Sequence, residues 1–375
     1  MVMRQQLTSL PQEMVLWGDG VLASALAGAR DFGVERPIVF TNETLKEMAQ
    51  QLVEPNLANC VGRFTGLAEH ALDSGIRRGL DSCIALEAQS IVAIGGGSVL
   101  DAAKAVSFLH HKERGRHLPI VALPTTLSGS EFSHYFGVTE TTEAQKFKRS
   151  YAVRETVPRV VILDPALLLQ TPRRLLLSSA IKSIDHAVEG MRRVSIDHPH
   201  AVMAASGVAR FFAVLGKWPK TVEVREAVRS GAVAMDDLLL LQLASWQCYF
   251  SPASVVYGLS HRIGHILGGT YGLPHSVTSC ITLAPVIRAC ADFYGERLSA
   301  FAIDSKSGAH AEDLAARIAE LVRTLRLPDH IRAFGLERAK LTEVAALLTA
   351  NYPNEVADLG SDSREKLGLL LEALW

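Results

Sequence analysis

Residues 90–104 read Ser90-Ile-Val-Ala-Ile94-Gly95-Gly96-Gly97-Ser98-Val-Leu-Asp101-Ala-Ala-Lys104. The first five residues are mostly apolar and predict a buried strand, and the residues after the glycines are typical of a helix. Glycine lets the backbone approach a ligand closely, and the free amides at the start of a helix attract phosphate. The stretch therefore predicts a strand, a phosphate-binding turn and a helix. An ordinary tight turn with Asp101 near the helix N-terminus would give the same pattern.

Strands and helices are expected to alternate on both sides of this stretch. Apolar segments predict strands at 14–17, 37–41, 60–64, 118–123 and 159–163, and amphipathic segments predict helices at 21–32, 45–52 and 72–87. Two further strands, 135–139 and 148–153, are expected around a polar turn at 140–145. Alternation of this kind predicts a parallel sheet covered by helices on both faces.

A second polar turn follows the strand at 118–123 and reads Pro124-Thr125-Thr126-Leu-Ser128-Gly129-Ser130-Glu131. Its hydroxyl groups fall at the carboxyl end of a strand, where open parallel sheets bind ligands. A turn that satisfies its own backbone would also be rich in Ser and Thr.

From Thr171 onward the pattern is helical throughout. We expect helices at 173–193, 200–215, 222–246, 256–267, 275–291 and 311–325. The sequence thus predicts two domains, an α/β dinucleotide-binding domain over 1–165 and an all-helical domain over 166–375.

The helical half contains histidines at turn-related spacing. His261 and His265 are one helical turn apart, Gly268 and Gly269 are expected to end that helix, and His275 follows a Leu-Pro turn. Lys182 and His186 are likewise one turn apart. A lone histidine on an apolar helix is usually a packed core residue. Several at this spacing predict a shared polar pocket inside the helical domain.

Composition narrows the class of partner. The chain has 375 residues and a formal net charge of -1, without a block of Lys and Arg, which argues against nucleic acid or an anionic membrane. The N-terminus lacks the apolar core of a signal peptide, and no apolar run approaches the roughly 18 residues of a membrane span. We expect a cytoplasmic protein whose five scattered cysteines are reduced.

In this order the motifs resemble those of iron-containing (group III) alcohol dehydrogenases, and the resemblance spans nearly the whole chain. Its elements are the glycine run, the Pro-Thr-Thr turn, Asp164-Pro165, His186-Ala-Val-Glu189, and 261–275. Within that family the chain looks most like maleylacetate reductases, which use NADH or NADPH to reduce a carbon–carbon double bond conjugated to a ketone. The resemblance implies a Rossmann-like parallel-sheet domain followed by an all-helical domain, the dehydroquinate synthase-like fold. It also implies a small-molecule substrate, a keto acid, and a homodimer.

The resemblance assigns cofactor-binding residues in the first domain. Gly95, Gly96, Gly97 and Ser98, with Asp101 in the same motif, would hold the pyrophosphate. Thr125, Thr126 and Ser130 would flank the ribose and nicotinamide, and Asn42 would lie beside the adenosine ribose. Many relatives carry Asp at this last position, where it repels a 2′-phosphate. Because Asn42 is neutral, NADPH need not be excluded.

The largest departure from the family concerns metal. Metal-dependent relatives bind the ion through an Asp and three histidines, at positions that correspond here to Lys182, His186, His261 and His275. An ammonium at the first position repels a divalent cation, although three histidines alone could hold zinc or iron if Lys182 were neutral or turned away. We expect no tightly bound iron. A salt bridge to Asp185 or Glu189 is the plain structural explanation for Lys182.

Lys182 suggests two chemistries. As a cation it could replace the metal by stabilising the enolate that forms when hydride reaches an unsaturated ketone, with His186, His261, His265 and His275 holding the substrate or supplying the proton. As a neutral amine it could form a Schiff base in a non-redox lyase, isomerase or decarboxylase.

A zinc- or iron-dependent alcohol dehydrogenase, and a non-catalytic dinucleotide sensor or scaffold, are further alternatives. Substrate identity is not encoded in a motif that we can interpret. Glu69, His70 and the segment 246–257 are expected to line the outer cleft, and Arg262 is a second candidate for binding carboxylate.

Overall fold

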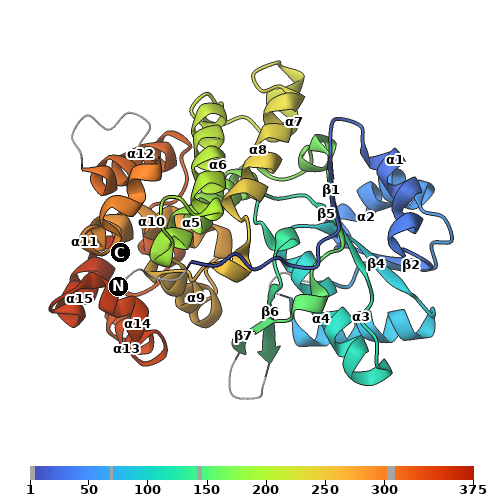
Figure 1. The fold of residues 1–375 in the computed structure, drawn as a ribbon, viewed down its shortest axis with the longest axis horizontal. Helices are drawn as coiled ribbons and strands as arrows, with labels where there is room; N and C mark the ends of the chain where they lie inside the picture. The colour runs from blue at the N-terminus through green and yellow to red at the C-terminus, as the bar shows by residue number, and fades with distance from the viewer. Residues whose placement is uncertain (1–4, 68–70, 142–145, 302–308) are drawn as a thin grey trace. The chain divides into compact units, whose positions relative to one another are not determined.

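The computed structural model describes residues 5–67, 71–141, 146–301 and 309–375. These residues group into two compact units (Figure 1). One, called the sheet unit here, comprises Thr8–Thr171 and Val233–Leu243. The other, called the helical unit, comprises the described residues 5–7, Pro172–Ala232 and Ala244–Trp375.

The sheet unit is built on six parallel strands in the order β1-β8-β5-β4-β2-β3. The strand bounds in that order are Met14–Trp17, Val160–Leu163, Ile120–Pro124, Ser90–Gly95, Pro37–Phe40 and Gly62–Phe64. The central strands β2, β4, β5 and β8 are buried along their whole length, which is why they read as continuous apolar runs. The predicted parallel-sheet domain is confirmed.

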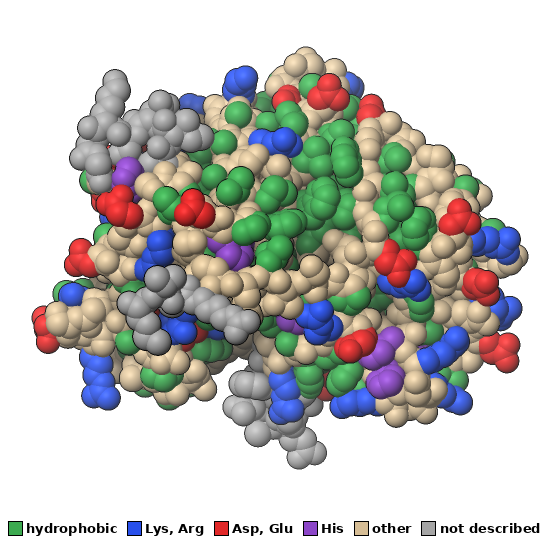
Figure 2. All heavy atoms as spheres, viewed as in Figure 1, with side chains coloured by type: hydrophobic (Ala, Val, Ile, Leu, Met, Phe, Trp, Pro, Cys, Tyr) green, Lys and Arg blue, Asp and Glu red, His purple; other side chains and the backbone are tan. Residues whose placement is uncertain are grey.

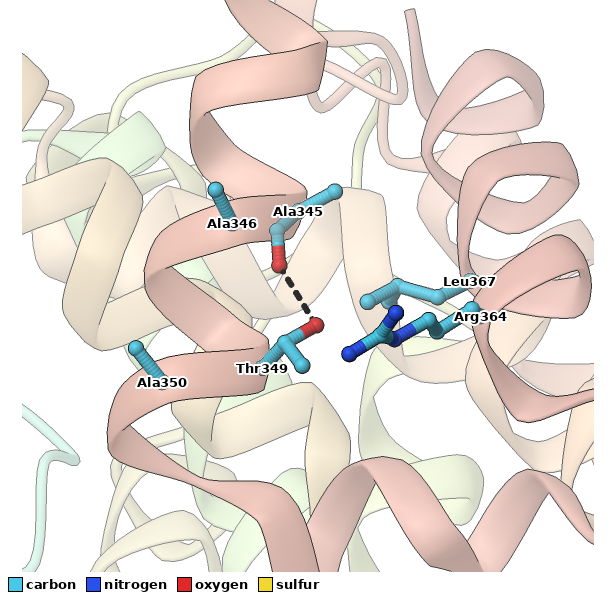
Figure 3. A pocket seen from close by; sticks show the side chains of 6 residues that line it. All are labelled: Ala345, Ala346, Thr349, Ala350, Arg364 and Leu367. Atoms are coloured by element: carbon cyan, nitrogen blue, oxygen red, sulfur yellow. Dashed lines mark hydrogen bonds between the residues drawn. The ribbon is translucent and has the colours of Figure 1, made fainter.

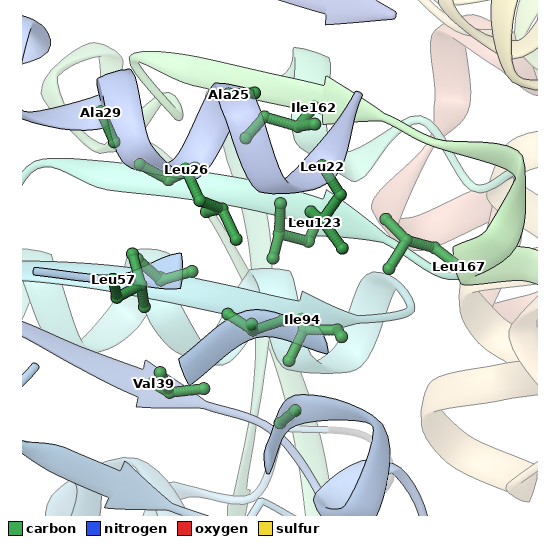
Figure 4. Close-up of a cluster of buried hydrophobic side chains, with 14 of the residues drawn as sticks. Leu22, Ala25, Leu26, Ala29, Val39, Leu57, Ile94, Leu123, Ile162 and Leu167 are labelled. Carbon is green, nitrogen blue, oxygen red and sulfur yellow. The ribbon is translucent and has the colours of Figure 1, made fainter. Parts of the chain in front are cut away.

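Alternate residues of these strands face opposite layers of helices. On one face, Val39, Ile94, Leu123 and Ile162 pack against Leu26 of α1 (Leu22–Ala27) in a buried cluster (Figure 4). The short α2 (Lys46–Met48) adds Met48 to the same cluster. The strand period of two therefore places the branched side chains where they lose most apolar surface to water.

The remaining sheet-unit elements are α3 (Asp73–Ala85), α4 (Gly97–Arg114) and the antiparallel hairpin of β6 (Tyr135–Thr141) and β7 (Lys146–Ala152). The ring of Phe108 on α4 lies 6.0 Å from that of Phe136 and 5.8 Å from that of Tyr151. This aromatic cluster anchors the hairpin to α4.

The helical unit confirms the predicted helical half. Its helices are α5 (Arg173–Gly190), α6 (Pro199–Leu215), α7 (Val224–Arg229), the end of α8 (Met235–Cys248), α9 (Leu259–Tyr271), α10 (His275–Ala289), α11 (Ala291–Tyr294), α12 (His310–Thr324), α13 (Leu341–Asn351), α14 (Pro353–Val356) and α15 (Ser363–Leu374). Sixteen residues of α5 are buried, so this helix forms the core of the unit.

Two predicted helix limits are wrong. The segment 222–246 is not one helix, because α7 ends near Ser230 and Gly231 takes a left-handed conformation (φ +74°) before α8 begins. The helix that carries His261 does not end at Gly268 and Gly269. It continues to Tyr271 and ends at Gly272, whose φ of +72° is the usual helix-terminating geometry.

Charges are mixed on the face drawn in Figure 2, where Lys and Arg side chains lie among acidic ones rather than in one block. Among the described residues no single helix is long and apolar enough to cross a membrane. One bent pair of helices, His275–Ala289 and Ala291–Phe301, passes that test jointly by length and composition alone. The cytoplasmic location stays a prediction.

Candidate active site

The glycine run lies at the carboxyl end of β4 and opens α4. Gly95 is the last residue of the strand, Gly96 precedes the helix in an extended conformation, and Gly97 is its first residue. The amide of Val99 donates to the carbonyl of Gly96 at 3.0 Å, and the positive end of the helix dipole at this first turn favours an anion. The predicted strand, turn and helix are confirmed, and the cofactor role of the glycines stays a prediction.

The Pro-Thr-Thr turn lies beside the glycine run because β5 neighbours β4. The amide of Thr125 donates to the carbonyl of Gly95 at 3.1 Å, and the carbonyl of Thr125 accepts from the hydroxyl of Thr171 at 2.5 Å. A Cβ on Gly96 would lie 2.9 Å from Cγ2 of Thr126. Glycine is therefore required at position 96 for the two turns to pack this closely.

A partly buried polar network, with Lys104 at its buried end, holds the end of this turn. The hydroxyl of Ser130 donates to Asp101 Oδ1 at 2.6 Å, and Lys104 Nζ donates to the carbonyl of Ser130 at 2.6 Å and to that of Tyr135 at 2.9 Å. Oδ2 of Asp101 accepts from the amide of Gly137 at 3.0 Å. The side chains of Asp101 and Ser130 thus hold the loop that follows β5 in place against α4.

Burial raises the pKa of Glu131 to about 7 and lowers that of Lys104 to about 8. For Lys104, the nearby charges of Asp101 and Glu131 partly oppose the effect of burial. Burial inside the sheet unit therefore disfavours the carboxylate form of Glu131 and the ammonium form of Lys104.

Asn42 follows β2 at the same edge of the sheet. Its side-chain oxygen accepts from the amide of Leu45 at 3.0 Å and caps a short 3₁₀ helix (Glu43–Leu45). This contact explains an Asn or Asp at the position without any ligand. The predicted contact with the adenosine ribose stays a prediction.

In the helical unit, Lys182, His186, His261, His265 and His275 converge as the spacing predicts. Lys182 and His186 come from α5, His261 and His265 from α9, and His275 is the first residue of α10. Ring centroids lie 5.5 Å apart for His186 and His261, 4.5 Å for His261 and His265, and 5.6 Å for His265 and His275. Three helices therefore build one imidazole cluster.

Lys182 is the buried cation of this cluster. Its Nζ donates to Asp185 Oδ2 at 2.9 Å and to His261 Nδ1 at 2.9 Å. Asp185 Oδ2 also accepts from the hydroxyl of Ser279 on α10 at 2.7 Å. The salt bridge considered from the sequence is therefore present, with Asp185 rather than Glu189 as the partner.

Glu189 has a different task, at the start of α9. Its Oε2 accepts from the amide of His261 at 3.2 Å, and its Oε1 accepts from the hydroxyl of Tyr294 at 2.8 Å. Gly258 makes room, since a Cβ there would lie 2.8 Å from Glu189 Oε2. A side chain of α5 thus satisfies an amide that the first turn of α9 leaves unpaired, and this fixes the position of His261.

Burial sets the charges around the cluster. It lowers the pKa of His186 and His261 well below the ordinary value, and the positive charge of Lys182 adds to the effect. Burial, aided by the charge of Asp185, raises the pKa of Glu189 to about 8. His186 and His261 are therefore neutral imidazoles beside the ion pair of Lys182 and Asp185.

The resemblance would place a divalent cation at His186, His261 and His275, and Lys182 lies against one of these three rings. The Nδ1 atom of His261 already accepts a hydrogen bond from Lys182, whose positive charge would lie next to the ion. Across the described parts of the chain, no three His, Cys, Asp or Glu side chains are gathered to hold one metal ion.

Several residues in contact with the cluster were missed or left without a role by sequence reasoning. Tyr249 stacks on His186 with ring centroids 4.1 Å apart, and Tyr257 stacks on His261 at 5.0 Å. Both tyrosines come from the segment 246–257, for which we found no motif. Ser279 gave no signal, because it acts only through Asp185, which lies on another helix. Glu69 and His70 lie outside the described residues.

The second carboxylate-binding candidate, Arg262, is already paired. Its Nε donates to Glu355 at 3.0 Å, and its guanidinium lies 4.9 Å from the ring centre of Tyr352. A surface hollow of about 440 Å³ elsewhere in the helical unit is lined by α13 and α15 (Figure 3). Its lining combines alanines with Thr349, Arg364 and Leu367 and offers no acid–base pair.

Comparison with known proteins bears on both units. A family model described as iron-containing alcohol dehydrogenase matches residues 11–165, and one described as the C-terminal part of the same family matches residues 241–365, together about three quarters of the chain. The chain belongs to the iron-containing alcohol dehydrogenase family. Members of this family are NAD(P)-dependent oxidoreductases, and this protein is one of them.

Within the family the chain is similar to maleylacetate reductases. It is 29% identical to the maleylacetate reductase of Pseudomonas sp. (strain P51), over 91% of this chain and 90% of that protein. The crystal structure of maleylacetate reductase from Rhizobium sp. strain MTP-10005 superposes with a TM-score of 0.78 at 23% identity, covering 100% of this chain and 99% of that one.

An iron-containing alcohol dehydrogenase from Corynebacterium glutamicum superposes with a TM-score of 0.83 at 23% identity, covering 100% of this chain and 97% of that one. The two structural likenesses show the fold alone.

Proposed function

We propose that this protein reduces a small unsaturated keto acid, of the maleylacetate type, with NADH or NADPH and without a catalytic metal ion. The observation that carries the proposal is the buried ammonium of Lys182 within the imidazole cluster. It lies at the chain position where the metal-dependent relatives have their first ligand. A positive charge is thus present in the cluster at the place where those relatives bind the metal.

The chemistry follows from where charge develops. Hydride transfer to the carbon–carbon double bond of an unsaturated ketone moves an electron pair to the carbonyl oxygen and gives an enolate. A fixed positive charge that is already in place stabilises this anion without reorganisation, and it acts strongly because the site excludes water. Lys182, which is 3% exposed, meets both conditions.

Schiff-base chemistry is less well supported. A nucleophilic amine must be neutral, whereas Lys182 faces the carboxylate of Asp185 at 2.9 Å, which favours the ammonium form. Two features support use of either cofactor, the glycine run at the start of α4 and the neutral Asn42.

Substitution of Lys182 tests the proposal. Lys182→Ala should lower kcat with maleylacetate by about 10²- to 10³-fold, as loss of one donor to an oxyanion does, with the Kd for NADPH changed little. Lys340→Ala, which removes an exposed lysine paired with Glu343, is the matched control and should leave kcat unchanged. Equal turnover in Lys182→Ala and the wild type would remove Lys182 from the mechanism.

A further inference from the structure

Lys182 is the third of four side chains in a hydrogen-bonded series that crosses three helices. The chain runs from Ser279 on α10 to Asp185 and Lys182 on α5 and ends at His261 on α9, with successive distances of 2.7, 2.9 and 2.9 Å. All four side chains are buried. The order of donors and acceptors along the chain decides the protonation of its last member.

The direction of the Lys182 to His261 bond fixes the tautomer of the imidazole. An ammonium has three hydrogens and no lone pair, so Nδ1 of His261 must be the acceptor. A neutral His261 then carries its own hydrogen on Nε2, the ring nitrogen that points away from Lys182. Two of the three Nζ hydrogens of Lys182 go to Asp185 and His261, which leaves the third for the enolate oxygen, while Nε2 of His261 carries the hydrogen that a substrate can receive.

We propose that Asp185, held by Ser279, is a positioning residue that aims Lys182 at Nδ1 of His261, and that His261 delivers the proton of the reduction from Nε2. This inference rests on the proposed reductase function and adds the route of the proton. It also distinguishes the role of His261 from the roles of the other histidines of the cluster, because His261 accepts a hydrogen bond from the buried ammonium of Lys182.

The proton balance of the step is closed. The hydride of NAD(P)H forms a C–H bond and leaves NAD(P)⁺, and the electron pair of the double bond becomes the enolate. The Nε2–H bond of His261 breaks as the enolate carbon is protonated, and an Nζ–H bond of Lys182 breaks as Nδ1–H forms. Nε2 then takes a proton from water as the Nδ1 proton returns to Lys182, which restores the ammonium and the starting tautomer of His261.

Asp185 is costly as a purely structural residue. It is 0% exposed, and its Oδ1 atom has no hydrogen-bond partner within the described residues. A buried ion pair contributes little to stability, and a buried carboxylate oxygen without a partner lowers it. Its contacts instead suit a carboxylate that orients Lys182, since Ser279 and Lys182 both donate to its other oxygen, Oδ2.

Nitrogen NMR of the full-length protein labelled with ¹⁵N in its histidine rings tests the inference without substrate. The His261 signals are assigned by their loss in His261→Gln. We expect Nε2 protonated and Nδ1 unprotonated in the wild type, and loss of this preference in Asp185→Asn. With maleylacetate and NADPH, Asp185→Asn should lower kcat by about 100-fold while the Kd for NADPH stays unchanged.

The matched pair of variants is Ser279→Ala, which removes the bond to Asp185, and Ser183→Ala, which removes a buried hydroxyl bound to Ser245 at 3.1 Å. Ser279→Ala should weaken the tautomer preference and lower kcat, whereas Ser183→Ala should change neither. If Asp185→Asn does not fold, these two serine variants still test whether Asp185 positions Lys182.

A wild-type His261 with its hydrogen on Nδ1, or equal behaviour of the two serine variants, would overturn the inference. If no keto acid is reduced, the proposed function fails, and the tautomer still decides whether the chain from Ser279 to His261 acts as described.

Discussion

Glu131→Gln should stabilise the sheet unit in a pH-dependent way. The folded-state pKa of Glu131 is about 7 against 4.5 when exposed. Because this pKa is raised, the folded state binds the proton more tightly than the unfolded chain, and stability is lost as pH rises from about 4.5 to 7. At about 1.4 kcal/mol per pKa unit, the ionised carboxylate costs about 3 kcal/mol above pH 7.

The glutamine side chain has nearly the same shape and no charge to bury. The variant should therefore match the wild type near pH 5 and be more stable by up to about 3 kcal/mol at pH 8. Other groups complicate the wild-type profile alone, because burial lowers the pKa of His134 to about 4 and that of Lys104 to about 8. The difference between variant and wild type removes their contributions to the extent that they act independently of Glu131.

Urea unfolding followed by circular dichroism at pH 5, 6, 7 and 8 gives the difference in unfolding free energy. Amide hydrogen exchange in β4 and β5 assigns it to the sheet unit. Glu155→Gln, an exposed acid of the same unit, is the control and should give a flat difference. A Glu131→Gln difference that is the same at all four pH values would refute the assignment of a raised pKa to Glu131.

Two glycine substitutions probe the close approaches that build the two sites. Gly96→Ala places a Cβ 2.9 Å from Thr126 and should distort the turn. A loss of about 1.4 kcal/mol of binding free energy raises the Kd for NADPH by about 10-fold, which a fluorescence titration measures. Gly28→Ala, whose Cβ meets open space, should leave this Kd unchanged. Gly258→Ala places a Cβ 2.8 Å from Glu189 and should lower the thermal unfolding midpoint and kcat together, by about 1–3 kcal/mol in stability. Gly368→Ala, in an open helical position of α15, is the control and should leave kcat unchanged while slightly raising the unfolding midpoint. If Gly258→Ala behaves in the same way, the close approach of Gly258 to Glu189 is not needed.

The fold was predictable where the sequence pattern is local. Continuous apolar strands such as Ser90–Gly95 and the glycines after them determine the parallel sheet and its first turn. The prediction of one helix over 222–246 was wrong because helical periodicity runs through Gly231, where the backbone takes a left-handed conformation that separates α7 from α8. The end of α9 was wrong for a related reason, since glycines are tolerated inside a helix and Gly272 provides the actual stop.

The site was predictable as a set of residues rather than as a mechanism. The one-turn spacing of Lys182 and His186, and of His261 and His265, brought the right side chains together. The bond from Lys182 to His261 joins residues 79 positions apart and depends on how α5 packs against α9. Ser279, Tyr249 and Tyr257 also reach the cluster only through tertiary packing, which no local sequence pattern reveals.

The most direct test of the proposed reduction is the oxidation of NADH and NADPH by the purified protein with maleylacetate, before and after removal of metal by a chelator, with metal content measured in each sample. The account predicts oxidation of at least one cofactor at a rate that neither chelation nor added zinc or iron changes. Activity that disappears with the metal and returns when it is restored would contradict it.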